Sequence, residues 1–509
     1  MENSWVFLAL AGLSALAFLC KIITCRRPVN RKIPPGPKPW PIIGNLNLLG
    51  PIPHQSFDLL SKKYGELMLL KFGSRPVLVA SSAEMAKQFL KVHDANFASR
   101  PMLAGGKYTS YNYCDMTWAP YGPYWRQARR RIYLNQIFTP KRLDSFEYIR
   151  VEERQALISQ LNSLAGKPFF LKDHLSRFSL CSMTRMVLSN KYFGESTVRV
   201  EDLQYLVDQW FLLNGAFNIG DWIPWLSFLD LQGYVKQMKA LKRTFDKFHN
   251  IVLDDHRAKK NAEKNFVPKD MVDVLLKMAE DPNLEVKLTN DCVKGLMQDL
   301  LTGGTDSLTA AVQWAFQELL RQPRVIEKAT EELDRIVGKE RWVEEKDCSQ
   351  LSYVEAILKE TLRLHPLGTM LAPHCAIEDC NVAGYDIQKG TTVLVNVWTI
   401  GRDPKYWDRA QEFLPERFLE NDIDMDGHNF AFLPFGSGRR RCPGYSLGLK
   451  VIRVTLANML HGFNWKLPEG MKPEDISVEE HYGLTTHPKF PVPVILESRL
   501  SSDLYSPIT

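Results

Sequence analysis

The hydrophobic pattern begins with one long apolar run at the start of the chain. Residues 5–25 contain few polar side chains and are about long enough for a single membrane-spanning helix. A basic flank follows, made of Arg26, Arg27, Arg31 and Lys32. Because positive flanks stay in the cytosol, we predict a single-pass membrane anchor over residues 1–28, with the rest of the protein cytosolic. A cleaved signal peptide is the alternative, but the positive charge that normally precedes its apolar run is missing.

Prolines dominate the next stretch, between Pro34 and Pro41. Such a run cannot be helical, so it predicts a stiff, extended spacer. A proline-rich motif for a partner protein is the alternative, because P-x-x-P is present. The position just after the anchor favours a spacer, and we predict a proline-rich hinge over residues 29–45 and one globular domain over residues 46–509.

Short strand signals and longer helical ones follow in that domain. Residues 67–72 and 75–80, with Gly73 and Ser74 between them, predict a β-hairpin, and residues 393–397 predict a further strand. The pattern from 140 to 300 is mainly helical. The fold class is therefore mainly α with small β-sheets.

Charge and breaker residues set the ends of several predicted helices. Residues 257–269 are charged and poor in apolar side chains, which predicts a solvated loop before a helix over residues 271–278. A helix over residues 354–364 ends at Pro366, and another is expected to begin at Pro123.

One long apolar helix candidate, residues 291–320, contains Gly303 and Gly304. Two glycines inside a helix cost roughly 1 kcal/mol each, so a structural or functional reason is expected. Asp306 and Ser307 follow directly, and an acid beside a hydroxyl can relay protons. A packing helix that happens to contain glycines is the other interpretation.

Composition narrows the class of protein. With 45% hydrophobic and 24% charged residues the chain is an ordinary globular protein, and its net charge of +6 is too mild to predict nucleic-acid binding. Nine cysteines at irregular spacing form no disulfide framework. That pattern fits a reducing compartment and one special thiol.

The special thiol is Cys442, within the stretch Phe435–Gly444, whose sequence is F-G-S-G-R-R-R-C-P-G. Glycines allow a tight backbone turn close to a flat cofactor, and arginines favour a thiolate and can pair with carboxylates. The stretch is therefore suited to present a thiolate to a metal ion. A basic glycine-rich turn with an idle cysteine is the alternative.

The stretch resembles the haem-binding loop of the cytochrome P450 family, matching F-x-x-G-x-R-x-C-x-G at every position. The resemblance implies a cytochrome P450 fold with an N-terminal transmembrane anchor helix and haem b held by the Cys442 thiolate. It implies that Phe435 shields the sulfur and that Arg440 binds a haem propionate. Trp125 and Arg129, four apart on one helix face, resemble the pair that binds a propionate in this family.

Further motifs follow in the order of the family. Asp306 and Ser307 occupy the proton-relay positions, with serine in place of the usual threonine and Leu308 departing from the pattern. Glu360, Arg363 and Arg417 resemble a buried network that serves fold and haem retention. Related enzymes usually carry an arginine after Pro-His; here Cys375 stands there, which leaves His374 as the candidate for that propionate contact. Residues 366–373 and 482–486 resemble pocket-lining segments.

The resemblance covers nearly the whole chain, which looks like a plant microsomal enzyme of specialised metabolism. It implies a monooxygenase of the endoplasmic reticulum membrane that takes O2, electrons from NADPH through cytochrome P450 reductase, and a small hydrophobic substrate. Terpenoids, flavonoids, lignans and sterols all remain open. A P450-fold isomerase, dehydratase or lyase and a non-catalytic haem protein are the rival hypotheses. Residues 218–229 form either a core turn or a contact with the lipid bilayer.

Overall fold

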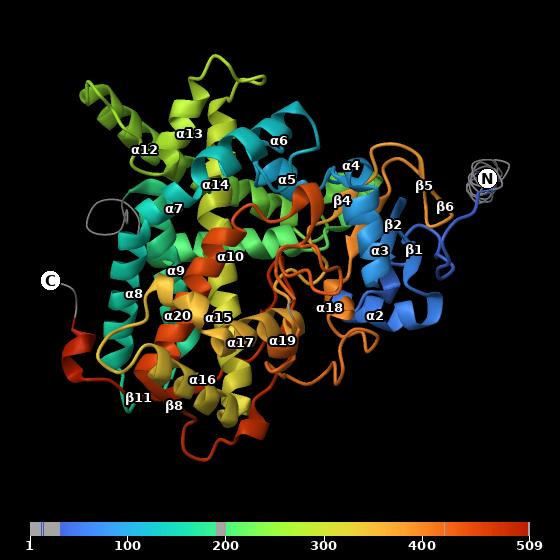
Figure 1. The fold of residues 1–509 in the computed structure, drawn as a ribbon. Coiled ribbons are helices and arrows are strands. Elements are labelled where there is room, and N and C mark those ends of the chain that lie inside the picture. Colours follow the sequence, from blue (N-terminus) through green and yellow to red (C-terminus); the bar gives the residue numbers. More distant parts are fainter. Residues whose placement is uncertain (1–11, 13, 15–30, 190–199, 422, 507–509) are drawn as a thin grey trace, which may run out of the picture.

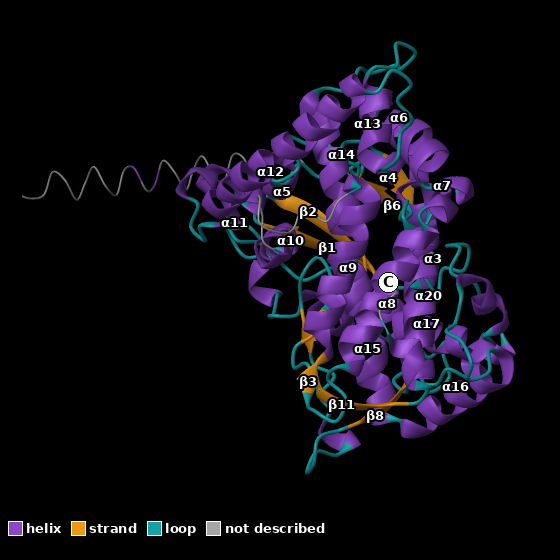
Figure 2. Ribbon diagram, turned by 90° about the vertical axis from the view of Figure 1, so that its left-hand side faces the viewer, coloured by secondary structure: helices purple, strands orange, loops and turns teal. Residues whose placement is uncertain are grey.

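The computed structural model describes residues 31–189, 200–421 and 423–506, together with Gly12 and Ser14. Helices make up most of the body, and strands occur at separate places around it (Figure 1, Figure 2). The long helices are α8 (Glu147–Asn162), α9 (Leu171–Leu188), α10 (Val200–Gly215), α12 (Tyr234–Ala262), α13 (Met271–Ala279), α14 (Asn290–Gly303), α15 (Asp306–Arg321), α16 (Pro323–Ile336), α17 (Ser352–Leu364) and α20 (Tyr445–Gly462). The predicted fold class, mainly α with small β-sheets, is confirmed.

The remaining α-helices lie between these elements in the chain. They are α2 (Pro53–Tyr64), α3 (Ala83–Lys87), α4 (Asp94–Phe97), α5 (Ala104–Tyr108), α6 (Pro123–Gln127), α7 (Pro140–Ser145), α11 (Ile219–Trp222), α18 (Val397–Ile400) and α19 (Arg417–Glu420). Helix α6 begins at Pro123 as predicted and continues as a π-helical segment to Ile137.

The largest described sheet has the order β1-β2-β7-β4. Its strands are β1 (Leu67–Phe72), β2 (Arg75–Ala80), β7 (Thr392–Val395) and β4 (His374–Cys375). The β1–β2 hairpin has the predicted bounds, and β2 pairs with β7 in parallel from Val77 opposite Thr392. The strand predicted over residues 393–397 ends at Val395, because the Asn396 side chain caps α18 by accepting a hydrogen bond from the Thr399 amide.

The other described sheets are small. One has the order β3-β11-β8, made of β3 (Phe169–Phe170), β11 (Pro493–Ser498) and β8 (Phe463–Lys466). The two-stranded ones pair β5 (Cys380–Val382) with β6 (Tyr385–Ile387), and β9 (Glu480–His481) with β10 (His487–Pro488).

Helix α15 runs through the middle of the core, in contact with α9, α17, α20 and β10. Its buried side chains include Trp314, Phe316 and Leu319, so this mostly apolar helix, as predicted from the sequence, is buried on nearly every side. The predicted interruption is present, since α14 ends at Gly303 and α15 begins at Asp306. The glycine break therefore lies at the centre of the molecule.

The loop predicted over residues 257–269 is wrong in its first part, because α12 continues to Ala262. Charged residues one turn apart pair along it, as Lys259 does with Asp255 at 2.8 Å, and the buried His256 fixes it to Asp270 at the start of α13. The predicted helix over residues 271–278 is confirmed as α13.

The predicted anchor and proline-rich hinge lie only partly within the described residues. The anchor over residues 1–28 lies almost wholly outside the described residues, and within the described residues no helix has the length and apolar character needed to cross a membrane. The proline run is extended, and the Leu69 amide donates to the Pro35 carbonyl at 2.8 Å, which places the run beside β1.

Candidate functional site

The loop that carries Cys442 turns sharply before α20. Gly436 and Gly438 both have φ +68°, and a Cβ at Gly438 would lie 2.2 Å from the carbonyl oxygen of Leu90, so glycine is required there. The Cys442 amide donates to the Phe435 carbonyl at 2.9 Å and closes the loop. Asp94 of α4 accepts the Arg439 amide at 3.2 Å and fixes the loop to the sheet side of the molecule. The sulfur is thereby held in one place by backbone contacts.

The surroundings of Cys442 act on its thiol in opposite directions. Burial raises its pKa, whereas the Gly444 amide and the charges of Arg129 and Arg441 lower it, and burial dominates. The arginines thus favour the thiolate as expected, but they do not outweigh burial. A coordinating metal cation deprotonates a thiol outright, so this buried sulfur suits an iron ligand.

Three arginines from different parts of the chain, the buried Arg100 and the half-buried Arg129 and Arg440, come together near this loop. Arg440 donates to the carbonyls of Ala98 and Ala119, both at 2.5 Å, and Arg100 donates to those of Ala372 at 2.7 Å and Pro373 at 2.8 Å. Arg129 packs on the Trp125 ring.

No carboxylate pairs with Arg100, Arg129 or Arg440 in the described part of the chain. Burial, together with repulsion between the neighbouring guanidinium groups, lowers the pKa of Arg440 to about 8 and that of Arg100 to about 10. Asp115 attracts Arg100 and Arg440, and Asp94 attracts Arg129, but neither carboxylate forms an ion pair with them. Three largely desolvated cations without a paired counter-ion are costly unless an anion completes the site. The cluster therefore fits the two carboxylates of a haem.

Arg100 was not predicted from the sequence. It sits between apolar residues, after Phe97 and Ala98 and before Pro101, and an arginine in such a stretch is the only local signal of a buried role.

Two other predicted haem contacts take specific positions. Trp125 is buried under the Arg440 guanidinium, whose centre lies 4.2 Å from the ring centre, and its indole N–H donates to the Met116 carbonyl at 3.1 Å. His374 on β4 donates from Nδ1 to the Phe97 carbonyl at 2.8 Å. Burial and the charge of Arg100 lower the His374 pKa to about 3. A carboxylate contact at its Nε2 therefore requires the protonated ring, which a neighbouring anion would favour.

The glycine break gives its two glycines different surroundings. A Cβ at Gly303 would meet open space, whereas one at Gly304 would lie 2.4 Å from the Met183 sulfur. Gly304 thus lets α9 approach closely, and Gly303 leaves room beside the helix. Ser307 donates to the Gly303 carbonyl at 2.8 Å. Its hydroxyl therefore lies beside the open space next to Gly303.

Asp306 points elsewhere. Its Oδ2 accepts a hydrogen bond from Nε2 of His487 on β10 at 3.0 Å, and no hydrogen bond joins Asp306 to Ser307 in the described structure. The two predicted relay residues are adjacent in the chain but have separate partners.

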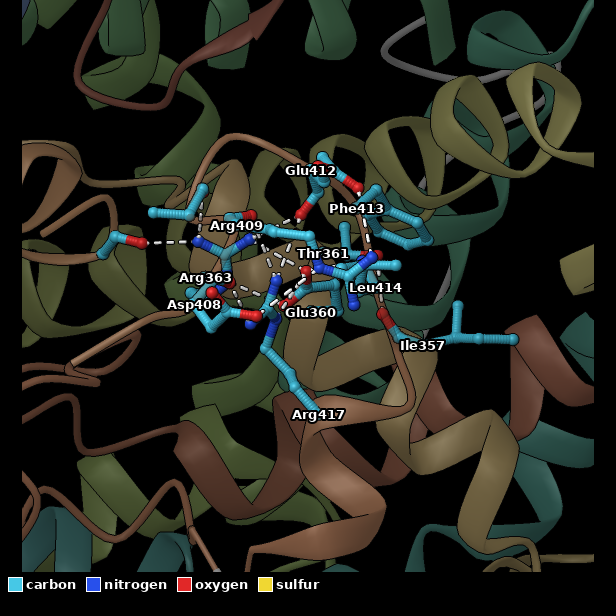
Figure 3. Close-up of polar contacts among 12 residues, drawn as sticks. Ile357, Glu360, Thr361, Arg363, Asp408, Arg409, Glu412, Phe413, Leu414 and Arg417 are labelled. Atoms are coloured by element: carbon cyan, nitrogen blue, oxygen red, sulfur yellow. Dashed lines mark hydrogen bonds and ion pairs between the residues drawn. The ribbon is translucent and has the colours of Figure 1, made fainter. Parts of the chain in front are cut away.

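Glu360, Arg363 and Arg417 form the predicted network (Figure 3). Glu360 and Arg363 are fully buried on α17 and pair through both carboxylate oxygens, at 2.7 and 2.8 Å. Arg417, which begins α19, donates to Glu360 at 3.1 Å. The network joins α17 to the chain segment that leads toward the Cys442 loop.

The two pocket segments predicted from the sequence meet at one cavity. Thr369, Met370 and Leu371 form one wall, and Tyr482 and Leu484 form another. The remaining walls are mainly aromatic or aliphatic and include Leu103, Trp118, Phe217, Trp222 and Leu394. An apolar cavity with few polar groups is typical of a small-molecule site.

A protein-family profile described as Cytochrome P450 matches residues 34–492. The chain belongs to the cytochrome P450 family. Trimethyltridecatetraene synthase of Zea mays is 42% identical over 529 residues, covering 98% of this chain and 95% of that protein. Flavonoid 3'-monooxygenase of Petunia hybrida is 42% identical over 483 residues, covering 93% of both. A solved structure of a zebra fish cytochrome P450 with abiraterone is 26% identical, with a TM-score of 0.75, and covers 88% of this chain and 100% of that one.

As a cytochrome P450, the protein is a haem-thiolate monooxygenase. The buried thiol and the arginine cluster fit this cofactor in charge and in donor chemistry.

Proposed function

We propose that this cytochrome P450 is a membrane-anchored monooxygenase of the plant endoplasmic reticulum that oxidises an apolar specialised metabolite, with Cys442 as the iron ligand. The observation that carries the assignment of Cys442 is the convergence of its buried sulfur with arginines that pair with no carboxylate. Haem supplies the activation of dioxygen from which one oxygen atom enters the substrate. Arg100, Arg129 and Arg440 hold its propionates, with Trp125 and His374 beside them, and Phe435 shields the sulfur.

Asp306 and Ser307 move protons toward the room left open at Gly303. This proposal is supported by the buried Asp306 carboxylate and by the Ser307 hydroxyl beside the Gly303 carbonyl. A side chain placed for proton transfer contributes about 100- to 10,000-fold to a rate.

Contact with the bilayer is supported by large apolar side chains that point to solvent between α11 and α12. Phe228 is 79% exposed and Trp225 is 60% exposed, whereas Trp222 is buried in the core. Residues 218–229 therefore combine a core contact, made by Trp222, with an exposed apolar surface that suits a lipid bilayer. An apolar cavity that shares Phe217 and Tyr482 with the site opens among these residues, so an apolar substrate can enter from lipid.

Electrons reach the haem from NADPH through the membrane-bound reductase. The helix that carries Trp125 also exposes Arg126, Arg130 and Arg131, a basic surface that suits an acidic flavin domain.

The substrate is a largely apolar molecule, and a terpenoid fits the site better than a polyhydroxylated flavonoid. Two polar groups in the cavity wall already have protein partners: Asn214 donates to the Trp210 carbonyl at 2.8 Å, and Asp221 accepts the Ala104 amide at 2.8 Å. The buried indole N–H of Trp118 has no partner among the described residues and suits a single substrate oxygen, not several. A buried substrate hydroxyl without a partner costs about 1–3 kcal/mol. Relatives named for both kinds of chemistry, the tetraene synthase and the flavonoid monooxygenase, are equally similar in sequence.

Microsomes that contain the full chain and a plant reductase test this proposal. We expect NADPH-dependent conversion of apolar terpenoids in a panel that also contains flavanones and phenylacetaldehyde oxime. Conversion of flavanones alone would refute the substrate class, and conversion without NADPH would favour an isomerase.

The variants Ser307→Ala and Asp306→Asn test proton delivery. Both should keep haem and substrate binding while product per NADPH falls and peroxide rises. Unchanged product per NADPH in both variants would show that protons travel by another route.

A further inference from the structure

The partner of Asp306 is a histidine that no sequence motif pointed to. His487 lies on β10, which packs against α15, and its Nε2 is 3.0 Å from Oδ2 of Asp306. The His487 side chain is 14% exposed and the Asp306 side chain 10% exposed, so the pair lies just below the surface. Nδ1 of His487 is buried and has no hydrogen-bond partner among the described residues. One ring nitrogen thus serves Asp306 and the other is left for a different partner.

Charged and titratable side chains from several elements surround this ring. Asp208 of α10 and His481 of β9 interact electrostatically with His487, and Lys172 of α9 and Lys489 beyond β10 act in turn on these two groups. Burial and the charge of Asp306 raise the pKa of Asp208, and burial and the charge of His487 lower that of His481. Asp208 and His481 are exposed to solvent, whereas Asp306 is buried. His487 therefore stands between a solvent-exposed polar cluster and the buried acid.

We propose that His487 is the positioning residue of the proton route: it holds the Asp306 carboxylate and passes protons to it from the surface cluster. This inference rests on the proposed role of Asp306 in a monooxygenase. A water molecule hydrogen-bonded at Nδ1 passes a proton from the surface cluster to the ring, which becomes an imidazolium. The ring then releases the Nε2 proton to Oδ2 of Asp306, which leaves a neutral ring and a carboxylic acid. Asp306 gives that proton to the site and returns to a carboxylate, and the ring regains its first tautomer by exchange with solvent.

A purely structural tie between α15 and β10 predicts different behaviour, and His487→Gln separates the two. Glutamine keeps an N–H that can bind Asp306 but cannot carry a proton through. The full chain would be assayed in microsomes with reductase and the panel compound that the wild type converts fastest. His428→Gln is the matched control, because it removes an exposed histidine ring that pairs with Asp426 and does not belong to the group around His487.

We expect His487→Gln to lower product per NADPH by about 10-fold, less than the 100-fold or more expected of Asp306→Asn. Spectral binding of the substrate should not change. Turnover driven by hydrogen peroxide should also survive, because peroxide brings the oxygen atom together with its protons and electrons. His428→Gln should behave like the wild type.

Two double-variant measurements complete the test. If His487 acts through Asp306, the variant with both Asp306→Asn and His487→Gln should couple no worse than Asp306→Asn alone. Independently of activity, the shifts of the thermal midpoint caused by the two substitutions should not add, as expected for side chains in contact.

Three results would overturn the inference. His487→Gln could couple like the wild type, it could lose peroxide-driven turnover as severely as NADPH-driven turnover, or its effect could multiply with that of Asp306→Asn. A wild type that converts no panel compound with NADPH would refute the proposed function itself and the inference with it. A coupled wild type with an equally coupled His487→Gln variant would refute the inference alone.

Discussion

Arg363 is the residue whose replacement should reveal most about the network behind the site (Figure 3). Each of its guanidinium N–H groups has an acceptor. Nε and one terminal nitrogen bind the two oxygens of Glu360, and the other bonds go to the carbonyls of Gly401, Ala410 and Glu412. The side chain is fully buried, so water cannot replace a lost bond.

Arg363→Lys keeps the charge but supplies three donors from a single nitrogen, against the five of arginine. At least two buried acceptors then lose their partner. At about 1–3 kcal/mol for each orphaned group, the free energy of unfolding should fall by about 2–6 kcal/mol. That is a large share of the roughly 5–15 kcal/mol that stabilises a typical domain.

Urea titration of the purified full-length protein, followed by the Soret band of the reduced CO complex, measures this loss together with haem release. The control is Arg409→Lys, in the same region but 59% exposed, which should shift stability by no more than about 0.5 kcal/mol. Equal midpoints and equal haem retention for the two variants would show that the network does not stabilise the domain as its geometry indicates.

Three further predictions follow from the anchor, the loop and the cavity. Cys442→Ser should abolish the red-shifted Soret band that thiolate ligation gives the reduced CO complex; a variant that keeps the band would identify another cysteine as ligand. Protease added to sealed microsomes should digest the catalytic domain, because residues 26–32 are basic and residues 5–25 are apolar; complete protection would place the domain in the lumen. Burial raises the pKa of Asp221 to about 6, above the value of about 3.9 in an unfolded chain. The folded state therefore holds this proton more tightly, and stability is lost as pH rises from about 4 through 6. Asp221→Asn should thus gain more stability over the wild type in urea titrations at pH 7.5 than at pH 5; an equal difference at both pH values would contradict the raised pKa.

Local sequence determined the elements whose geometry depends on neighbouring residues. The hairpin of β1 and β2 follows from two short apolar runs separated by Gly73 and Ser74, and the helix start at Pro123 follows from the fixed φ of proline. The break between α14 and α15 follows from two adjacent glycines. In each case the physical cause lies within a few residues, so a single sequence contains it.

Motif spacing also predicted the chemistry of the site, but only where the residues stand in a contiguous or fixed pattern. Cys442 and its glycines are an example, and Glu360 with Arg363 is another, because three positions on a helix share a face.

Tertiary structure alone decided which distant side chains meet. Arg440 reaches the Ala98 carbonyl, beside Arg100, across a separation of 342, and His487 reaches Asp306 across a separation of 181. Neither contact leaves a periodic or local signal, since it depends on how β10 and the loop before α5 pack against other elements. The same holds for the length of α12, where pairs between side chains one turn apart and the buried contact of His256 with Asp270 outweigh a composition that is typical of a loop. The fold also decides the pKa of each site residue. The same arginine or acid has an ordinary pKa in water and a shifted one where the fold excludes water.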